Sequence, residues 1–156
     1  MKQTCLIVAD GARARLFVVA PAQGARRGIR LIERAALVNG EVKSHGRSGS
    51  GAVKSERNTN RQAGPVHPIE AQRDRHRVEH ERRFGAEIVK RASELTNDWD
   101  EGVVVLIAEP RLLGLVRERL RKALRPSLRL EELAKDYSSY SKLALERLVA
   151  SRRLVQ

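Results

Sequence analysis

One stretch of this chain is apolar at every position, and it restricts the folds that the chain can adopt. Residues 103–108 read Val-Val-Val-Leu-Ile-Ala and have no polar face. A strand of this kind is typical of the centre of a sheet that is buried on both faces. Residues 4–9 are also mostly apolar and predict a further strand. The sequence therefore predicts an α/β fold in which helices pack on a sheet.

The remaining elements follow from periodicity and from turn residues. Asp10-Gly11 is a hairpin signal between the first two strands, and Pro126 ends a helix. The predicted order is β-β-β-α-β-α-β-α, which suits a mixed five-stranded sheet with packed helices, and ribonuclease H-like folds share this outline. The predicted strands are 4–9, 13–19, 29–38, 103–108 and 128–133, and the predicted helices are 68–95, 110–125 and 141–154.

Length and motifs limit the possible classes of protein. The 156 residues predict a single domain, 1–156, and the one cysteine, Cys5, excludes an internal disulfide and is expected in a buried strand. No apolar stretch is long enough for a membrane span or a signal peptide, so we predict a cytoplasmic protein. The sequence contains no Walker A loop, dinucleotide glycine fingerprint or Cys-x-x-Cys motif, and no cofactor is predicted.

The charge of the chain predicts attraction to polyanions. Lys and Arg number 31 against 19 Asp and Glu, which gives a formal net charge of +12. Nucleic acid is the commonest polyanionic partner and anionic membrane the second, while a basic protein without such a partner is the alternative. Aromatic residues make up only 3% of the chain, so duplex or structured RNA is a better candidate than stacked single strands.

Residues 39–66 are rich in glycine and poor in apolar residues, so a mobile loop is predicted there. The following helix has an apolar stripe only in its second half, so its first half, residues 70–83, is expected to project into solvent and is called the stalk. A tolerated insertion is the alternative to a functional arm. The basic residues of loop and stalk that are candidates for nucleic-acid binding are Lys43, Arg47, Lys54, Arg57, Arg61, Arg73, Arg75 and Arg77.

The predicted helix 110–125 is a second candidate for nucleic-acid binding. Arg117, Arg121 and Arg125 recur at every fourth residue and share one stripe, and Arg111 and Lys122 lie near it. A phosphate backbone would relieve the repulsion among these cations. The alternatives are a solvated face or pairing with distant carboxylates.

A histidine motif on the stalk offers a metal site as an alternative. His76-Arg-Val-Glu79-His80 matches the H-x-x-E-H pattern of some zinc enzymes, in which both histidines share one helix face. A third ligand would have to come from elsewhere, such as Glu131 or Glu132. Flanking arginines disfavour a dication, so solvated histidines are the default interpretation.

Two carboxylates at strand ends offer another alternative. Asp10 and Glu109 each end an apolar strand, and two-metal nucleases gather carboxylates at such places. A third carboxylate from the long helix, such as Glu87, would be needed. Asp10 is explained equally well by its turn, and Glu109 by the following helix N-terminus.

Four segments give the chain a resemblance to the bacterial host attachment protein family. The family usually has proline where Glu109 stands, and the segments span nearly the whole chain in the family's order. The four segments are Val-Ala-Asp-Gly-Ala-Arg-Ala-Arg-Leu-Phe at 8–17, His76-x-x-Glu79 leading to Arg83-Phe84, residues 103–108 followed by Glu-Pro-Arg-Leu-Leu-Gly, and Lys-Asp-Tyr-Ser at 135–138.

This family is similar to the central domain of archaeal and eukaryotic peptide-chain release factors. In those proteins a Gly-Gly-Gln tip occupies the position of loop 39–66, but here the nearest runs are Gly-Ser-Gly at 49–51 and Gln-Ala-Gly at 62–64. The resemblance therefore implies an RNA- or ribosome-facing projection without peptidyl-tRNA hydrolysis.

The sequence favours a non-catalytic binding domain for RNA or the ribosome over an enzyme. The alternatives are a metal-dependent nuclease or hydrolase and a protein-interaction module in attachment to host cells. The oligomeric state stays open.

Overall fold

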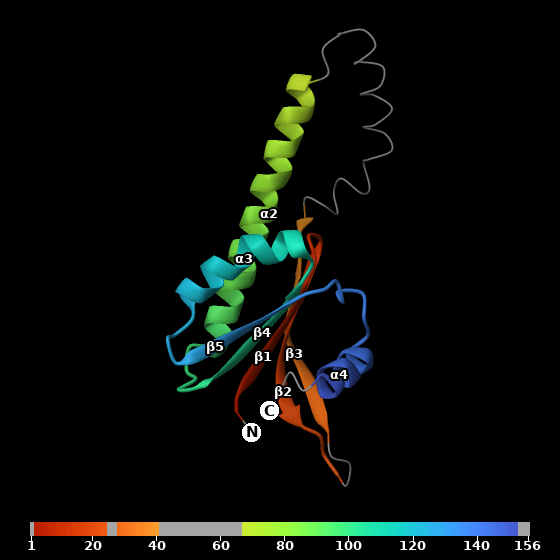
Figure 1. The fold of residues 1–156 in the computed structure, drawn as a ribbon, viewed down its shortest axis with the longest axis vertical. Coiled ribbons are helices and arrows are strands. Elements are labelled where there is room, and N and C mark those ends of the chain that lie inside the picture. Colours follow the sequence, from red (N-terminus) through yellow and green to blue (C-terminus); the bar gives the residue numbers. More distant parts are fainter. Residues whose placement is uncertain (1, 25–27, 41–66, 153–156) are drawn as a thin grey trace.

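The computed structural model describes residues 2–24, 28–40 and 67–152, which form a mixed sheet with helices on both faces (Figure 1). The predicted order β-β-β-α-β-α-β-α is confirmed for this part of the chain. The elements are β1 Thr4–Ala9, β2 Arg13–Pro21, β3 Ile29–Val38, α2 His67–Thr96, β4 Gly102–Ala108, α3 Pro110–Ala123, β5 Leu128–Ala134 and α4 Lys142–Ser151.

The five strands lie in the order β3-β2-β1-β4-β5. The first three form an antiparallel meander, and β4 and β5 join it as parallel strands. Since β1 and β4 are parallel neighbours at the centre, Ala9 pairs with Ala108, and the residues that follow both strands emerge at the same edge of the sheet. Asp10 and Glu109 are therefore brought to one edge, an arrangement that the sequence offered only as an alternative.

One face of the sheet is covered by α2 and α3. Ile7, Leu106, Ile88 and Leu120 are fully buried there, and Cys5 belongs to the same cluster. Burial raises the pKa of the Cys5 thiol to about 12, so the thiol stays protonated and unreactive at neutral pH. The prediction of a buried strand cysteine is confirmed.

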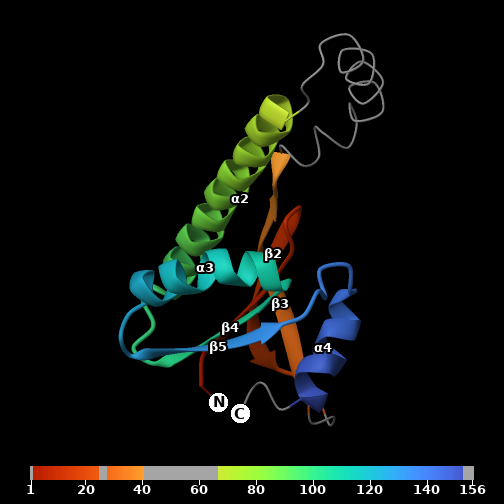
Figure 2. The ribbon, with the colours of Figure 1, turned by 45° about the horizontal axis from the view of Figure 1, so that its top comes forward.

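The two covering helices cross in close contact, and Figure 2 shows α3 lying across α2. A Cβ on Gly85 of α2 would lie only 3.3 Å from a methyl group of Val116 in α3, so the small residue permits the close approach. The Arg119 guanidinium donates to the backbone carbonyl of Arg82 at 3.3 Å. These contacts fix α3 beside the second half of α2.

Among the described elements, α4 is the helix that covers the opposite face of the sheet. Leu145 and Val149 of this helix pack on a second cluster that contains Leu6, Phe17 and Leu31. The helix begins at Ser141, whose hydroxyl accepts from the amide of Ala144 at 3.1 Å, as an N-cap serine should. Its Glu146 also accepts from the backbone amide of Leu31 at 2.9 Å, which occupies one donor on the edge strand β3.

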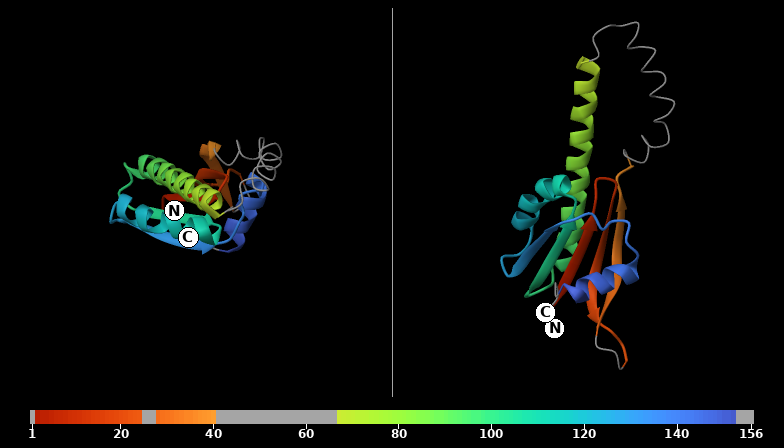
Figure 3. Two further views of the ribbon diagram at one scale, coloured as in Figure 1. Left: turned by 90° about the horizontal axis from the view of Figure 1, so that it is seen from above. Right: turned by 45° about the vertical axis from the view of Figure 1, so that its right-hand side comes forward.

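The first half of α2 rises beyond the sheet, as Figure 3 shows in its right-hand view. The side chains of residues 72–77 are all exposed, whereas Phe84, Ile88 and Ala92 are buried. The prediction of a projecting stalk is confirmed for these residues. Most of the predicted loop, residues 41–66, lies outside the described residues.

Three predicted boundaries differ from the structure by two residues or more, and the others lie within one residue. The second strand continues past residue 19 to Pro21, because its pairing with β3 extends to Pro21 opposite Ile29. The helix predicted over 110–125 ends at Ala123, since Leu124 already has an extended conformation two residues before Pro126. The described last helix ends at Ser151 instead of 154, and residues 153–156 lie outside the described part of the chain.

Candidate functional site

The predicted cations of the loop and stalk are only partly described. Arg73, Arg75 and Arg77 lie on the exposed stalk, and Arg77 forms an ion pair with Asp74 at 3.1 Å. This pair is exposed on both sides, so it contributes little to stability. The cations that lie outside the described residues are Lys43, Arg47, Lys54, Arg57 and Arg61.

The arginine stripe of α3 is largely paired within the protein. Arg121 contacts Glu118 and Glu132, with nitrogen–oxygen distances of 3.2 Å in both cases, and Arg117 lies 3.9 Å from Glu132. Pairing with distant carboxylates, which the sequence left open, thus holds for two of the three stripe residues. The sequence could not predict it, because Glu132 reaches the stripe from β5.

Arg111 also has a carboxylate partner, although the two groups are poorly aligned for a hydrogen bond. Its Nε lies 3.1 Å from Glu81 Oε2, yet this buried oxygen accepts no hydrogen bond in the described part of the chain. We therefore regard the contact as a charge–charge attraction without hydrogen-bond alignment. Lys122 is exposed in the last turn of α3 and has no ion pair with a described residue.

A hollow at the turn between α3 and β5 gathers three guanidinium groups. We call it the arginine hollow; its volume is about 450 Å³. Arg121 and Arg125 were predicted site residues, whereas Arg129 was missed, although it comes only four residues after Arg125. The described residues that line the hollow include no Asp or Glu and are Arg121, Leu124, Arg125, Pro126, Ser127, Leu128, Arg129 and Leu130.

The three arginines of the arginine hollow differ in how they are held. Arg125 donates to the carbonyl of Trp99 at 3.4 Å and has no carboxylate partner among the described residues, while Arg129 pairs with Glu131 at 2.7 Å. The hollow also adjoins the C-terminal end of α3, whose partial negative charge favours nearby cations. Guanidinium groups bind phosphate and carboxylate oxygens in two-point contacts, so the hollow can hold an anionic group.

A second cluster lies at the strand edge and is acidic. Asp10 Oδ1 accepts from the amides of Ala12 and Arg13 at 2.7 and 2.8 Å, which explains its place in the hairpin turn. The buried Ser138 hydroxyl lies 2.6 Å from Asp10 Oδ2 and 2.7 Å from Asp136 Oδ1. Because a hydroxyl has one proton, it can donate to only one of these two carboxylates at a time.

The two strand-end carboxylates have opposite pKa shifts. Burial alone would raise the pKa of Asp10, but the hydrogen bonds from Ser138 and from the amides of Arg13 and Ala12 outweigh it and lower the pKa. The pKa of Glu109 is raised, first by burial and then by repulsion from Asp10, Asp136 and Glu81, which the Arg111 charge opposes. The cluster therefore disfavours full ionisation at Glu109.

The third carboxylate of this cluster is not the one that the sequence suggested. Glu87 lines a separate small hollow near His80 and Arg83, whereas Glu81, almost two turns earlier on α2, is the long-helix carboxylate that acts on Glu109. Glu81 is three residues before the buried Phe84, so the two lie on one face of α2. This spacing could have indicated that Glu81, and not Glu87, is the carboxylate of the cluster. Asp136 and Ser138 were missed because they meet Asp10 through tertiary contact.

The candidate metal ligands do not assemble. The His76 and His80 rings stack with centroids 6.4 Å apart, and Glu79 pairs with Arg83 at 3.0 Å. The proposed third ligands, Glu131 and Glu132, are held by arginines. Within the ranges that the structure describes, no group of three or more His, Cys, Asp or Glu side chains is placed to hold a metal ion.

Comparison with models of known protein families gives a match that covers most of the chain. The model of the family described as "Protein required for attachment to host cells" matches residues 5–149. No curated protein matches the chain. None of the described helices is both long and apolar enough to span a membrane.

One solved structure is similar only at a low level. It is the crystal structure of the type II variant of the Aquifex aeolicus Ppx/GppA phosphatase, with 12% identity over 85% of this chain and 36% of that chain. The chain thus spans little more than a third of the phosphatase. The TM-score is 0.36, which carries no argument about fold or function.

Proposed function

Because the chain belongs to the family described as "Protein required for attachment to host cells", we propose that it is a non-catalytic binding domain for an anionic partner, with structured RNA as the first candidate. The observation that supports this most directly is the arginine hollow. Its lining brings three guanidinium groups together without an Asp or Glu among the described lining residues. Since Arg121 and Arg129 already contact carboxylates outside the lining, a phosphate group would supply counter-charge mainly to Arg125.

The position of the arginine hollow suits a macromolecular partner. The hollow lies at the end of α3, whose last turn also carries the exposed Lys122, and at the start of β5, where Arg129 lines it. A formal net charge of +12 adds long-range attraction to any polyanion. The stalk, which rises from the same α2 on which α3 packs, would extend the cationic surface through Arg75.

Salt dependence tests this proposal. A fluorescently labelled RNA hairpin would be titrated with the protein, and anisotropy measured between about 50 and 200 mM salt. The dissociation constant should rise steeply with salt, and Arg125→Ala should reduce the slope of its logarithm by about 1. Arg30→Ala, an exposed arginine on the edge strand β3, is the matched control and should leave the slope unchanged. Affinity that does not depend on salt, or equal effects of the two substitutions, would overturn the proposal.

A metal-dependent hydrolase at the acidic cluster is a second candidate, although the described residues include no group of three or more side chains placed to hold a metal ion. Asp10, Glu109, Asp136 and Glu81 lie near one another where strand-end carboxylates serve metal-dependent nucleases. Incubation of the RNA probe with Mg²⁺, Mn²⁺ or Zn²⁺ separates the two candidates. Cleavage that is lost in Asp10→Asn would replace the binding proposal with this one.

A protein-interaction module is the remaining candidate, and the family's description favours it. Copurification from native lysate, with and without nuclease, distinguishes it from RNA binding. A protein partner that is retained after nuclease treatment, and that Arg125→Ala does not release, would support this third function against the first.

A further inference from the structure

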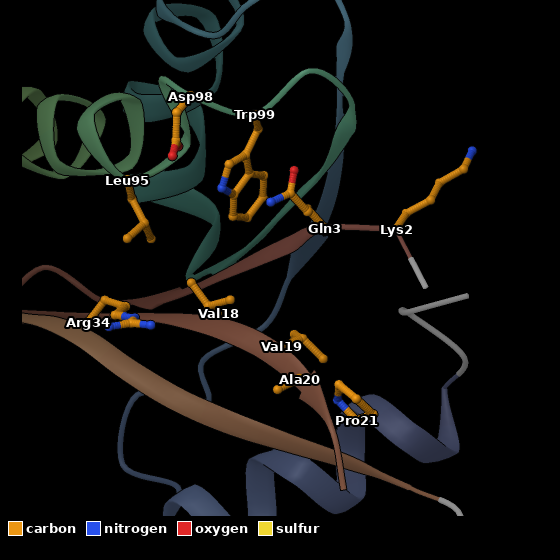
Figure 4. Close-up of a pocket in the computed structure, with 10 residues that line it drawn as sticks. All are labelled: Lys2, Gln3, Val18, Val19, Ala20, Pro21, Arg34, Leu95, Asp98 and Trp99. Carbon is orange, nitrogen blue, oxygen red and sulfur yellow. The ribbon is translucent and has the colours of Figure 1, made fainter.

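A large cavity lies at the end of the sheet opposite to the acidic cluster. Its volume is about 640 Å³, within the usual range for small-molecule sites of roughly 300–1,000 Å³. Four parts of the chain form it, namely the segment before β1, the second half of β2, β3 through Arg34, and the end of α2 with the turn that follows (Figure 4). None of the candidate residues discussed above lines it.

The cavity has an apolar floor that the fold leaves partly open. Val18 of β2 and Leu95 of α2 are half-buried, and the Trp99 ring forms the wall above them. Covering apolar surface of this kind with a ligand is favourable, because it removes that surface from water. A smaller hollow of about 220 Å³ shares Leu95 and Arg34 with the cavity, so the open surface continues along α2.

The wall beside Trp99 is held firmly by backbone contacts. The Gln3 carbonyl accepts from the amide of Val103 at 2.9 Å, and the Trp99 amide donates to the Thr96 carbonyl at 3.1 Å. A Cβ on Gly102 would lie 2.7 Å from the Gln3 carbonyl oxygen and 3.0 Å from the Trp99 ring, so only glycine permits this packing. The cavity is therefore formed by the fold itself before any ligand arrives.

Five polar side chains line the cavity without a partner among the described residues, namely Lys2, Gln3, Arg34, Asp98 and Trp99, and Figure 4 shows Lys2 pointing away from the Trp99 ring. The Arg34 and Asp98 side chains are exposed and form no ion pair, even with each other. Trp99 is only 6% exposed, and its indole N–H, which keeps some contact with solvent, has no hydrogen bond within the described ranges. Figure 4 shows Arg34 and Asp98 on opposite sides of Leu95, with the indole nitrogen on the ring edge that faces them.

We propose that this cavity binds a short apolar peptide with free termini. The Arg34 guanidinium would hold the terminal carboxylate and Asp98 the terminal ammonium group, while the apolar side chains cover Val18 and Leu95. The Trp99 N–H would donate to a peptide carbonyl. A ligand with both charges fits better than a simple anion, because Asp98 repels an anion at the same mouth where Arg34 attracts it.

The single tryptophan reports directly on this cavity. Trp99 is the only tryptophan in the sequence, so its fluorescence follows occupancy without interference from another indole. Trileucine with free termini is the probe, and N-acetyl-trileucine amide, which has the same apolar body without terminal charges, is the matched control ligand. Trileucine should change the fluorescence saturably, and the capped peptide should bind about tenfold or more weakly.

Substitutions separate charge recognition from general apolar binding. Arg34→Ala and Asp98→Asn should each weaken trileucine binding by about tenfold or more, and Arg30→Ala on the same strand should not. Both side chains are exposed, so the thermal midpoint should stay close to that of the wild type. RNA binding should be unchanged in both variants, which keeps this result independent of the proposed function.

Several outcomes of these binding experiments would contradict the proposed peptide site. Equal affinity for the free and capped peptides, wild-type affinity in both variants, or no saturable fluorescence change would overturn the proposal. A fluorescence change that depends on protein concentration alone would show that a second copy of the chain covers the cavity, and would also overturn it.

Discussion

At the scale of single residues, the ionisation of the acidic cluster depends on which carboxylates receive its few hydrogen-bond donors. Ser138 supplies one hydroxyl proton to two aspartates, while Asp10 has two further backbone donors and Glu109 has repelling neighbours. Asp10 is therefore stabilised as an anion and Glu109 is not. The fold tolerates this imbalance because Glu109 keeps partial contact with solvent.

The raised pKa of Glu109 predicts a specific pH dependence. A carboxyl group whose folded-state pKa is raised binds its proton more tightly in the folded than in the unfolded protein. Its contribution to stability is therefore full below an unfolded pKa near 4.5 and is lost as pH rises through the higher folded pKa. Glu109→Gln should raise the thermal midpoint at pH 7 by a small amount and have little effect at pH 4.

A matched substitution separates this effect from a general loss of negative charge. Glu101, exposed just before the opposite end of β4, is the control, and Glu101→Gln should not reproduce the difference between the two pH values. Thermal unfolding followed by circular dichroism at both pH values is the measurement. A midpoint that falls at pH 7 in Glu109→Gln would contradict the repulsion described above.

At the scale of elements, local sequence predicted most of the fold but little of the candidate sites. The strands at 4–9 and 29–38 match the structure at both ends, because turn residues and pattern changes flank them. The arginine hollow and the acidic cluster depend on contacts that join separate elements, such as Glu132 with Arg121 and Ser138 with Asp10. Periodicity within one segment does not predict contacts between separate elements. The sequence therefore identified some residues of the arginine hollow and of the acidic cluster but not their partners.

The stalk is the element whose stability should differ most from the rest. Residues 72–77 are all exposed, so this half of α2 gains little from packing, whereas one face of the second half, with Phe84, Ile88 and Ala92, is buried in the cluster that includes β1 and α3. Amide hydrogens of residues 76–80 should exchange much faster than those of residues 88–92. Arg75→Gly should weaken the local helix by about 1 kcal/mol and leave the global midpoint nearly unchanged.

Hydrogen exchange measured by mass spectrometry on peptides from the two halves of α2 tests this prediction. The matched control is Ala92→Gly in the buried half, which has the same helix penalty but also loses packing and should lower the global midpoint. Equal protection of both halves would mean that another molecule, or the part of the chain outside the described residues, covers the stalk.

At the scale of the whole molecule, one sheet joins two hydrophobic clusters that share no side chain. The alternation of β1 places Ile7 in the cluster under α2 and α3, and Leu6 in the cluster under α4. Removing α4 would therefore expose the opposite side of strands whose other side is still covered. Since both clusters depend on the same backbone hydrogen bonds, we predict that the described part of the chain unfolds as a single cooperative domain.

Leu145→Ala in α4 tests this coupling, because Leu145 is fully buried on the face opposite to Trp99. Deleting its side chain should cost about 2–5 kcal/mol. If the two layers unfold together, urea curves from Trp99 fluorescence, on the α2 side, and from far-ultraviolet circular dichroism should coincide in both proteins and shift to the same lower midpoint in the variant. An early circular-dichroism transition, with Trp99 fluorescence still at its wild-type midpoint, would mean that α4 detaches on its own. In that case the sheet with α2 and α3 would be the cooperative unit, and α4 only an attached layer.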